Sequence, residues 1–349
     1  MRKSFLPKLT VLAAVFALAL TGCQSKSNNT TSAETSATES AETTTAETTA
    51  AAEATTVEVT DIHGTVTVPV NPKTVVALDN RTFETLSDWG IKLAAVPKGV
   101  MPADSPYVAD SEVQDIGNHS EPNLEIIAAA DPELVIVGQR FASYYEEIKK
   151  LVPNAAVVDL SFQVSKEAGK SGESFVAGLK DSTIALGKIF NKNEEAEKLT
   201  ADFDQSIEKA KSAYNGTDKI MSVVVSGGDI GFSAPVSGRV WGPLYEVFGW
   251  TSALEVSGAT SDHQGDDISV EAIAQSNPDW IFVLDRDAAI SSTKDAVPAQ
   301  DVINNSPALQ NTTAITEGQV VYAPNDTYTN ESIQTFIELF DNLATSLTK

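Results

Sequence analysis

The chain has 349 residues, one cysteine and a formal net charge of −24 at pH 7. One cysteine excludes a disulfide within the chain, and the large excess of acidic residues argues against nucleic-acid binding, which requires Lys and Arg to neutralise phosphates. The length is sufficient for two lobes of ordinary size.

The first residues have the pattern of a bacterial lipoprotein signal peptide. Three basic residues precede an apolar run over 9–20, which is shorter than a membrane span of about 20 residues. The tetrapeptide Leu-Thr-Gly-Cys that ends at Cys23 fits a cleavage-and-lipidation box. We therefore predict a signal peptide over residues 1–22 and a lipid on Cys23. An uncleaved anchor and an ordinary signal peptide are the alternatives.

The next segment, residues 24–56, consists almost entirely of Thr, Ser, Ala and Glu and contains no aromatic or branched aliphatic residue. Such a segment buries too little apolar surface to offset the entropy lost on ordering. We predict that residues 23–56 form a lipidated, disordered tether with a mean reach of about 30 Å.

Strand and helix patterns alternate from Val57 onward. Apolar and polar residues alternate on both sides of His63, which predicts a hairpin whose turn exposes this histidine. Buried-strand and helix patterns follow one another as far as two long amphipathic helices over 173–190 and 193–214, and they resume after residue 215. Alternating strands and helices predict parallel sheets.

We therefore predict an α/β fold with two Rossmann-like lobes. The N-terminal lobe comprises residues 57–192 and the C-terminal lobe residues 215–349, and a long α-helix over 193–214 joins them. Ligands of such sheets bind beyond the carboxyl ends of the strands, and pockets favour domain interfaces. A ligand cleft between the lobes follows.

One unit of sequence occurs twice. "LEIIAAADPELVIVGQR" ends at Arg140 and "VEAIAQSNPDWIFVLDR" ends at Arg286, with a constant offset of 146 residues (286 − 140). Each copy reads as a short helix, a turn and a buried strand followed by arginine. If the lobes face each other, both arginines point into one cleft.

Arg239, in "SAPVSGRVWG", follows a further strand and turn. Three arginines that converge on one cleft would repel one another without an anion, and their forked donors suit carboxylate or catecholate oxygens. The alternative is that each arginine pairs with a nearby carboxylate, since Asp285 and Asp287 flank Arg286.

Two histidines and a tyrosine lie in loops near the expected cleft. His119 and His263 precede the two copies of the repeated unit, and Tyr328 precedes the last helix. A nitrogen of His263 and the phenolate of Tyr328 would complete the coordination of a hard ferric ion. A solvated or structural histidine and a surface tyrosine are the alternatives.

The repeated unit also places an acidic residue in the first turn of each helix. Glu125 and Glu271 hold the same position in the two copies. The helix dipole alone accounts for acidic residues there, but the matched positions would also place one acidic side chain on the outer face of each lobe.

The lipobox, the tether and the phrases "NLEIIAAADPELVIV" and "SVEAIAQSNPDWIFVLDR" resemble the iron-complex solute-binding lipoproteins of ABC importers. The resemblance covers residues 57–349. It implies two α/β lobes joined by one long helix, no catalytic turnover and no cofactor. It also implies a monomer outside the cytoplasm, held to the membrane by its lipid, that delivers a ferric siderophore to an ABC permease. The absence of G-x-S-x-G, H-E-x-x-H and Walker motifs agrees with this.

Within that class the arginine segments look like those of ferric catecholate siderophore binders. This likeness implies that Arg140, Arg239 and Arg286 contact the ligand, and that His263 and Tyr328 ligate its iron. Trp241, two residues from Arg239, is expected at the cleft.

The resemblance further implies that Glu125 and Glu271 dock the permease. Two alternatives stay open. Within the class, the ligand is a hydroxamate siderophore, haem or a corrinoid. Outside it, the chain is a lipid-anchored metal-dependent hydrolase whose metal ligands are the two loop histidines and nearby aspartates (His119, His263, Asp262, Asp266 or Asp267).

Overall fold

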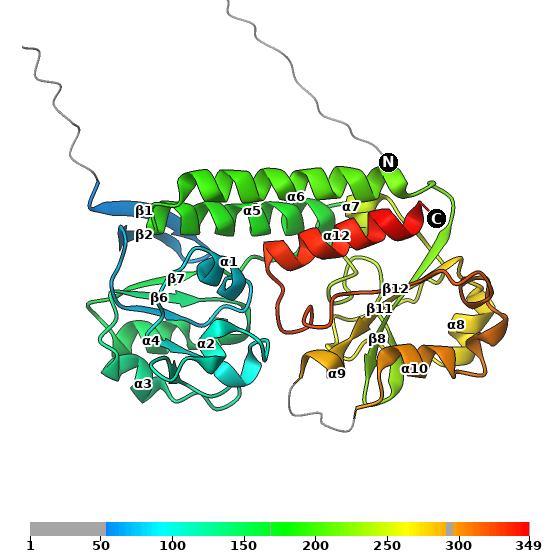
Figure 1. The fold of residues 1–349 in the computed structure, drawn as a ribbon, viewed down its shortest axis with the longest axis horizontal. Coiled ribbons are helices and arrows are strands. Elements are labelled where there is room, and N and C mark those ends of the chain that lie inside the picture. The colour runs from blue at the N-terminus through cyan, green and yellow to red at the C-terminus, as the bar shows by residue number, and fades with distance from the viewer. Residues whose placement is uncertain (1–53, 168, 291–295, 349) are drawn as a thin grey trace, which may run out of the picture. The chain divides into compact units, whose positions relative to one another are not determined.

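The computed structural model describes residues 54–167, 169–290 and 296–348. Within these ranges the chain forms two five-stranded sheets, a two-stranded hairpin and covering helices (Figure 1). The predicted signal peptide, Cys23 and nearly all of the predicted tether lie outside the described residues.

The first sheet belongs to the N-terminal lobe and has the strand order β5-β4-β3-β6-β7, with every pair parallel. Its strands are β3 (Val75–Ala77), β4 (Ala95–Val96), β5 (Gln114–Asp115), β6 (Leu134–Val137) and β7 (Ala156–Asp159). The helices between them are α1 (Phe83–Asp88), η1 (Lys98–Val100), α2 (Pro106–Ala109), α3 (Leu124–Ala129), η2 (Gln139–Tyr144) and α4 (Tyr145–Leu151). Successive residues of β6 enter two different apolar clusters, so both faces of this sheet are covered.

The second sheet belongs to the C-terminal lobe and has the order β10-β8-β11-β12, with β9 antiparallel to β8. Its strands are β8 (Lys219–Ser226), β9 (Asp229–Phe232), β10 (Thr251–Ser252), β11 (Trp280–Asp285) and β12 (Val320–Tyr322). Its helices are α7 (Leu244–Phe248), α8 (Val270–Ser276), α9 (Arg286–Ala289), α10 (Ala299–Asn304), η3 (Leu309–Asn311) and α11 (Thr313–Thr316). The tight turn between β8 and β9 uses Gly227 and Gly228 at φ values of 63° and 87°, which favour glycine.

Three long helices pack together beside the sheets: α5 (Ser171–Ile189), α6 (Asn193–Ala213) and α12 (Ile333–Leu347) (Figure 1). The helix predicted over 193–214 is α6. Helix α5 also extends between the lobes. Its first turn is held by Glu246 of α7, and the carbonyl of Ile189 at its other end accepts the amide of Asn71 in the N-terminal lobe. Edge-to-face aromatic rings, such as Phe175 on Phe336 at 4.8 Å, fill the space between these helices.

The predicted hairpin is β1 (Thr56–Asp61) paired with β2 (Gly64–Pro69). The turn exposes His63, as expected, and its imidazole also has two partners. The imidazole stacks on Tyr145 with ring centroids 3.7 Å apart, and its Nε2 lies 3.2 Å from the buried carboxylate of Asp159. A buried acid at the end of β7 requires a partner, and the hairpin supplies one.

Candidate functional site

Arginines follow the carboxyl ends of strands in both lobes. Arg81 follows β3, Arg140 follows β6 and Arg286 directly follows β11. Gly138 at the end of β6 allows a close approach of the chain there, because a Cβ at this position would lie 2.2 Å from the carboxyl carbon of Asp79. The parallel sheets thus deliver basic side chains to the edges where α/β proteins bind ligands.

The three predicted arginines surround one aromatic ring. The guanidinium carbons of Arg140, Arg239 and Arg286 lie 5.6, 4.3 and 5.2 Å from the ring centroid of Tyr328. Arg140 and Arg239 also donate from Nη2 to the backbone carbonyl of Tyr328, at 3.0 and 3.2 Å. The ring is only 4% exposed. Arginines from both lobes therefore surround the side chain of Tyr328.

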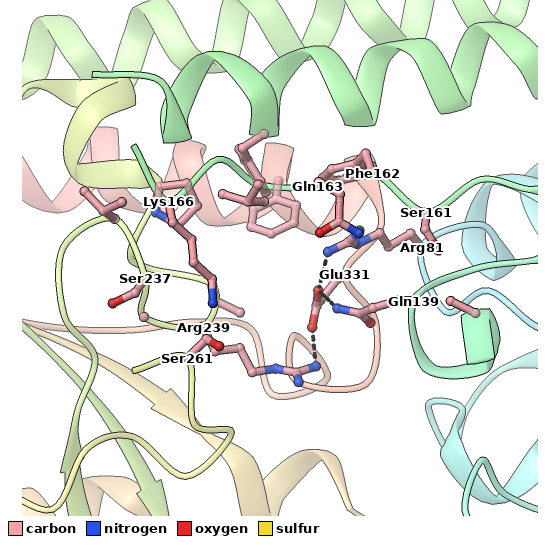
Figure 2. Close-up of a pocket in the computed structure, with 18 residues that line it drawn as sticks. Arg81, Gln139, Ser161, Phe162, Gln163, Lys166, Ser237, Arg239, Ser261 and Glu331 are labelled. Carbon is pink, nitrogen blue, oxygen red and sulfur yellow. Dashed lines mark hydrogen bonds and ion pairs between the residues drawn. The ribbon is translucent and has the colours of Figure 1, made fainter. Parts of the chain in front are cut away.

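A fourth arginine and a buried glutamate complete the cluster. Glu331 contacts Arg239 and lies 3.3 Å from Nη2 of Arg81, and it accepts a hydrogen bond from the Gln139 amide at 3.0 Å (Figure 2). Burial favours a higher pKa for the Glu331 carboxyl, but Arg239, Arg81 and Arg140 together hold this pKa below its ordinary value. Glu331 is therefore ionised at neutral pH.

The arginines keep unused hydrogen-bond donors. In the described part of the chain, the buried Nε atoms of Arg81, Arg140, Arg239 and Arg286 have no hydrogen-bond partner. Burial and the nearby Arg239 lower the pKa of Arg140, which shows how closely the positive charges are placed. A buried donor without an acceptor is costly, and an anionic ligand would remove that cost.

A cavity of about 350 Å³ opens beside this cluster, between residues of the two lobes (Figure 2). Arg81 and Gln139 line it from the N-terminal lobe, Ser237 and Arg239 from the C-terminal lobe, and Glu331 between them. Its apolar wall includes Phe162, Phe175 and Phe336, and the guanidinium of Arg81 lies 4.0 Å above the ring of Phe162. Such a mixed wall suits a ligand that is both aromatic and anionic.

Trp241 does not reach the cleft, contrary to expectation. A tight turn around Val240, at φ 63°, closes with the amide of Trp241 donating to the carbonyl of Arg239 at 2.7 Å. The turn directs Arg239 to the cleft and Trp241 into the core, where it is 0% exposed and packs on Phe282. The large apolar indole is more stable there, and we leave it out of the site.

The two loop histidines have different surroundings. Burial and the charges of Arg140 and Arg239 lower the pKa of His119, which keeps its imidazole neutral at pH 7. The side chain of His263 is 51% exposed, with Nδ1 3.8 Å from Asp262. Among the described residues, no three His, Cys, Asp or Glu side chains group closely enough to hold a metal ion. Iron ligation by His263 and Tyr328 stays a prediction.

Glu125 and Glu271 occupy matching positions in the two lobes. Each lies in the first turn of its helix, α3 or α8, and each is exposed. Asn123 and Ser269 cap these helices by accepting a backbone amide. Their role in docking stays a prediction.

Sequence reasoning missed Arg81, Gln139 and Glu331. Arg81 follows the buried strand "VVALDN" much as Arg140 follows "LVIV", so the same rule would have found it. Gln139 precedes a predicted arginine. Nothing in the sequence around Glu331 distinguishes it from a helix-start acid.

Comparisons with known proteins show which family the chain belongs to. Residues 75–327 match the model of the periplasmic binding protein family. The petrobactin-binding protein YclQ of Bacillus subtilis is 31% identical over 271 residues, covering 77% of this chain and 79% of the relative. The ferric-anguibactin-binding protein FatB of Vibrio anguillarum is 29% identical over 285 residues, covering 80% and 84%.

Solved structures share the fold. The crystal structure of YclQ aligns with a TM-score of 0.70 at 26% identity, over 84% of this chain and 99% of that one. The catecholate-siderophore binding protein VctP of Vibrio cholerae aligns with a TM-score of 0.67 at 22% identity, over 84% and 99%. No helix in the described ranges is both long and apolar enough to cross a membrane.

These relatives bind solutes for transporters and are not enzymes, which sets aside the hydrolase alternative. The matched family model spans most of the chain. The chain belongs to the periplasmic binding protein family, and its relatives include a petrobactin-binding and a ferric-anguibactin-binding protein.

Proposed function

We propose that this protein captures a ferric siderophore of the catecholate type in the arginine cleft and delivers it to an ABC permease. The observation that carries the proposal is the convergence of Arg140, Arg239 and Arg286 on one buried ring, each with a buried Nε that has no partner among the described residues. The names of the relatives YclQ and FatB support a ferric siderophore.

The chemistry of the cleft favours catecholate over hydroxamate. Ferric catecholate complexes are anionic and present aromatic faces, whereas ferric tris-hydroxamates are neutral. Guanidiniums bind anionic oxygens and stack on aromatic rings, and phenylalanine rings line the adjacent cavity. A ligand that leaves iron positions open would let His263 and Tyr328 coordinate the metal.

Delivery requires attachment and docking. A lipid on Cys23 would keep the protein near the membrane while its lobes contact a permease. The exposed Glu125 and Glu271, one on each lobe, would contact basic residues of the two permease subunits. The protein acts as a monomer in this scheme.

A binding panel tests the proposal. The protein is titrated with a ferric catecholate siderophore, its iron-free form, a ferric hydroxamate, haem and a corrinoid, and tryptophan fluorescence is followed. We expect saturable quenching at submicromolar concentration by the ferric catecholate alone. Selective binding of the hydroxamate, haem or the corrinoid would refute the catecholate assignment, and binding of none would refute the function.

A further inference from the structure

Glu331 is an acidic residue at the centre of a site proposed to attract anions. Its side chain is 6% exposed and lies between Arg81, at 10%, and Arg239, at 17%. Those two arginines belong to different lobes, so one carboxylate bridges the cleft (Figure 2). A buried carboxylate is expensive unless it is paired, and two guanidiniums and an amide pair this one.

The charge balance of the cleft follows from these contacts. Among the described residues, four arginines surround or border the site, and two carboxylates pair with their guanidinium groups: Glu331, and Asp287 with its Oδ1 3.5 Å from Arg286. Asp79 contacts only the backbone amide of Arg81. Asp287 also accepts the amide of Gly227 at 2.5 Å, so it fixes the end of β8 as well. Within the described ranges the Glu331 carboxylate accepts no backbone amide, and its contacts are with side chains of the cleft.

We propose that the carboxylate of Glu331 determines which net ligand charge the cleft binds most tightly. This inference rests on the proposed function. The carboxylate offsets the positive charge of Arg81 and Arg239, so the site prefers ferric complexes with fewer negative charges than a tris-catecholate trianion. The ligand class that follows is a ferric complex in which catecholate is combined with donors of lower charge. A purely structural role, holding the arginines in place, would affect every ligand alike.

Glu331→Gln separates these roles because it keeps the side-chain shape and removes the charge. The full chain is titrated by calorimetry with a trianionic tris-catecholate, a monoanionic bis-catecholate and a neutral tris-hydroxamate complex of iron. We expect the affinity of the variant relative to the unsubstituted protein to rise about tenfold per unit of negative ligand charge, as for unit charges about 10 Å apart at an effective dielectric of about 20. An equal change for all three complexes would overturn the proposal.

Glu84→Gln is the matched control. Glu84 of α1 is also a carboxylate at the start of α12, where it accepts hydrogen bonds from Asn330, Ser332 and Thr335, but it contacts none of the four arginines in the described structure. The Glu84→Gln substitution removes the same charge from the same region. The dependence of binding affinity on ligand charge should stay unchanged in this variant. A similar slope in both variants would mean that net charge, and not Glu331, sets selectivity.

Two further measurements apply if the single variant does not fold or if no ferric complex binds. If the single variant does not fold, the double variant Arg81→Gln/Glu331→Gln removes a buried pair together, and it should restore the charge dependence of the unsubstituted protein. If no ferric complex binds, the proposed function fails, and inorganic phosphate, pyrophosphate and tripolyphosphate then serve as charge probes in thermal unfolding. Glu331→Gln should steepen the rise in Tm with anion charge, and an unchanged slope would refute the role of Glu331.

Discussion

At the residue scale, the site is defined by where arginines meet an aromatic ring. Arg140 and Arg286 come from the two copies of one sequence unit, and Arg239 comes from a tight turn. Each arginine alone has an ordinary explanation. Their convergence on Tyr328 brings like charges together, which requires opposite charge nearby. Glu331 and Asp287 supply part of that charge, and we propose that an anionic ligand supplies the rest.

Removing one arginine of the cluster should weaken ligand binding. Arg140→Ala and Arg286→Ala should each lower the affinity for the ferric ligand about 10- to 100-fold, the range expected for a charge-assisted hydrogen bond. Fluorescence titration measures this loss. Lys150→Ala, at an exposed basic position on α4, should bind as the unsubstituted protein does, and an equal loss in that variant would contradict a specific role.

Asp79 predicts a pH dependence of stability. Burial raises its pKa from 3.8 to about 6. Because the folded state holds this proton more tightly than the unfolded chain, the stability contributed by the protonated group is complete below pH 3.8 and is lost as the pH rises through about 6. The side chain of the Asp79→Asn variant does not ionise. From pH 4 to pH 7 its free energy of unfolding should gain up to about 3 kcal/mol relative to the unsubstituted chain.

Urea unfolding at several pH values measures this difference. The comparison cancels groups that titrate equally in both proteins. A difference that stays constant between pH 4 and pH 7 would show that Asp79 ionises normally.

At the scale of elements, α5 depends on a cap supplied by another helix. Glu246 of α7 accepts hydrogen bonds from the amides of Gly169, Ser171 and Gly172 at 2.5, 2.6 and 3.1 Å, and from the Ser171 hydroxyl. These bonds satisfy free amides of a helix N-terminus and place a negative charge at the positive end of the dipole. The contact fixes where the chain enters the helical layer.

Glu246→Ala should therefore destabilise the protein by about 2 kcal/mol, the combined range for a lost cap and a charge-assisted hydrogen bond. Urea unfolding measures this loss. Glu195→Ala removes an exposed carboxylate that pairs with Lys192 on the surface, and it should leave the stability nearly unchanged. Equal effects in the two variants would argue against the cap.

The elements show which features a sequence can predict. The hairpin, the repeated units and the long helix α6 follow from local periodicity, and the structure has them. The Trp241 position depends on a turn around Val240 with positive φ, a conformation that valine rarely adopts. The partnership of His63 with Asp159 and the bridge of Glu331 between arginines join residues far apart in the chain. Such contacts follow only from the packed fold.

At the scale of the whole molecule, the helices α5, α6 and α12 pack against each other, and polar contacts join α1 to the start of α12. A helical connection bends less readily than a loop, so we expect a small change in lobe spacing on ligand binding. The repeated unit gives each lobe one exposed glutamate and one arginine beside the Tyr328 ring.

Docking through the glutamates should be separable from ligand capture. Glu125→Lys and Glu271→Lys should abolish uptake of the ferric ligand by cells that express the transporter, while ligand affinity stays unchanged, because both residues are exposed at the starts of α3 and α8. Iron-55 uptake and fluorescence titration measure the two properties. Glu317→Lys, at another exposed position, should transport normally, and loss in that variant would indicate a general charge effect.

The most direct test of the central claim is calorimetric titration of the protein with one catecholate siderophore, with and without its iron. We expect one-to-one binding of the ferric complex at submicromolar concentration and binding at least about 100-fold weaker for the iron-free form, since iron gathers the anionic oxygens that the arginines are proposed to contact. Equal affinity for the two forms, or no binding of either, would contradict that claim.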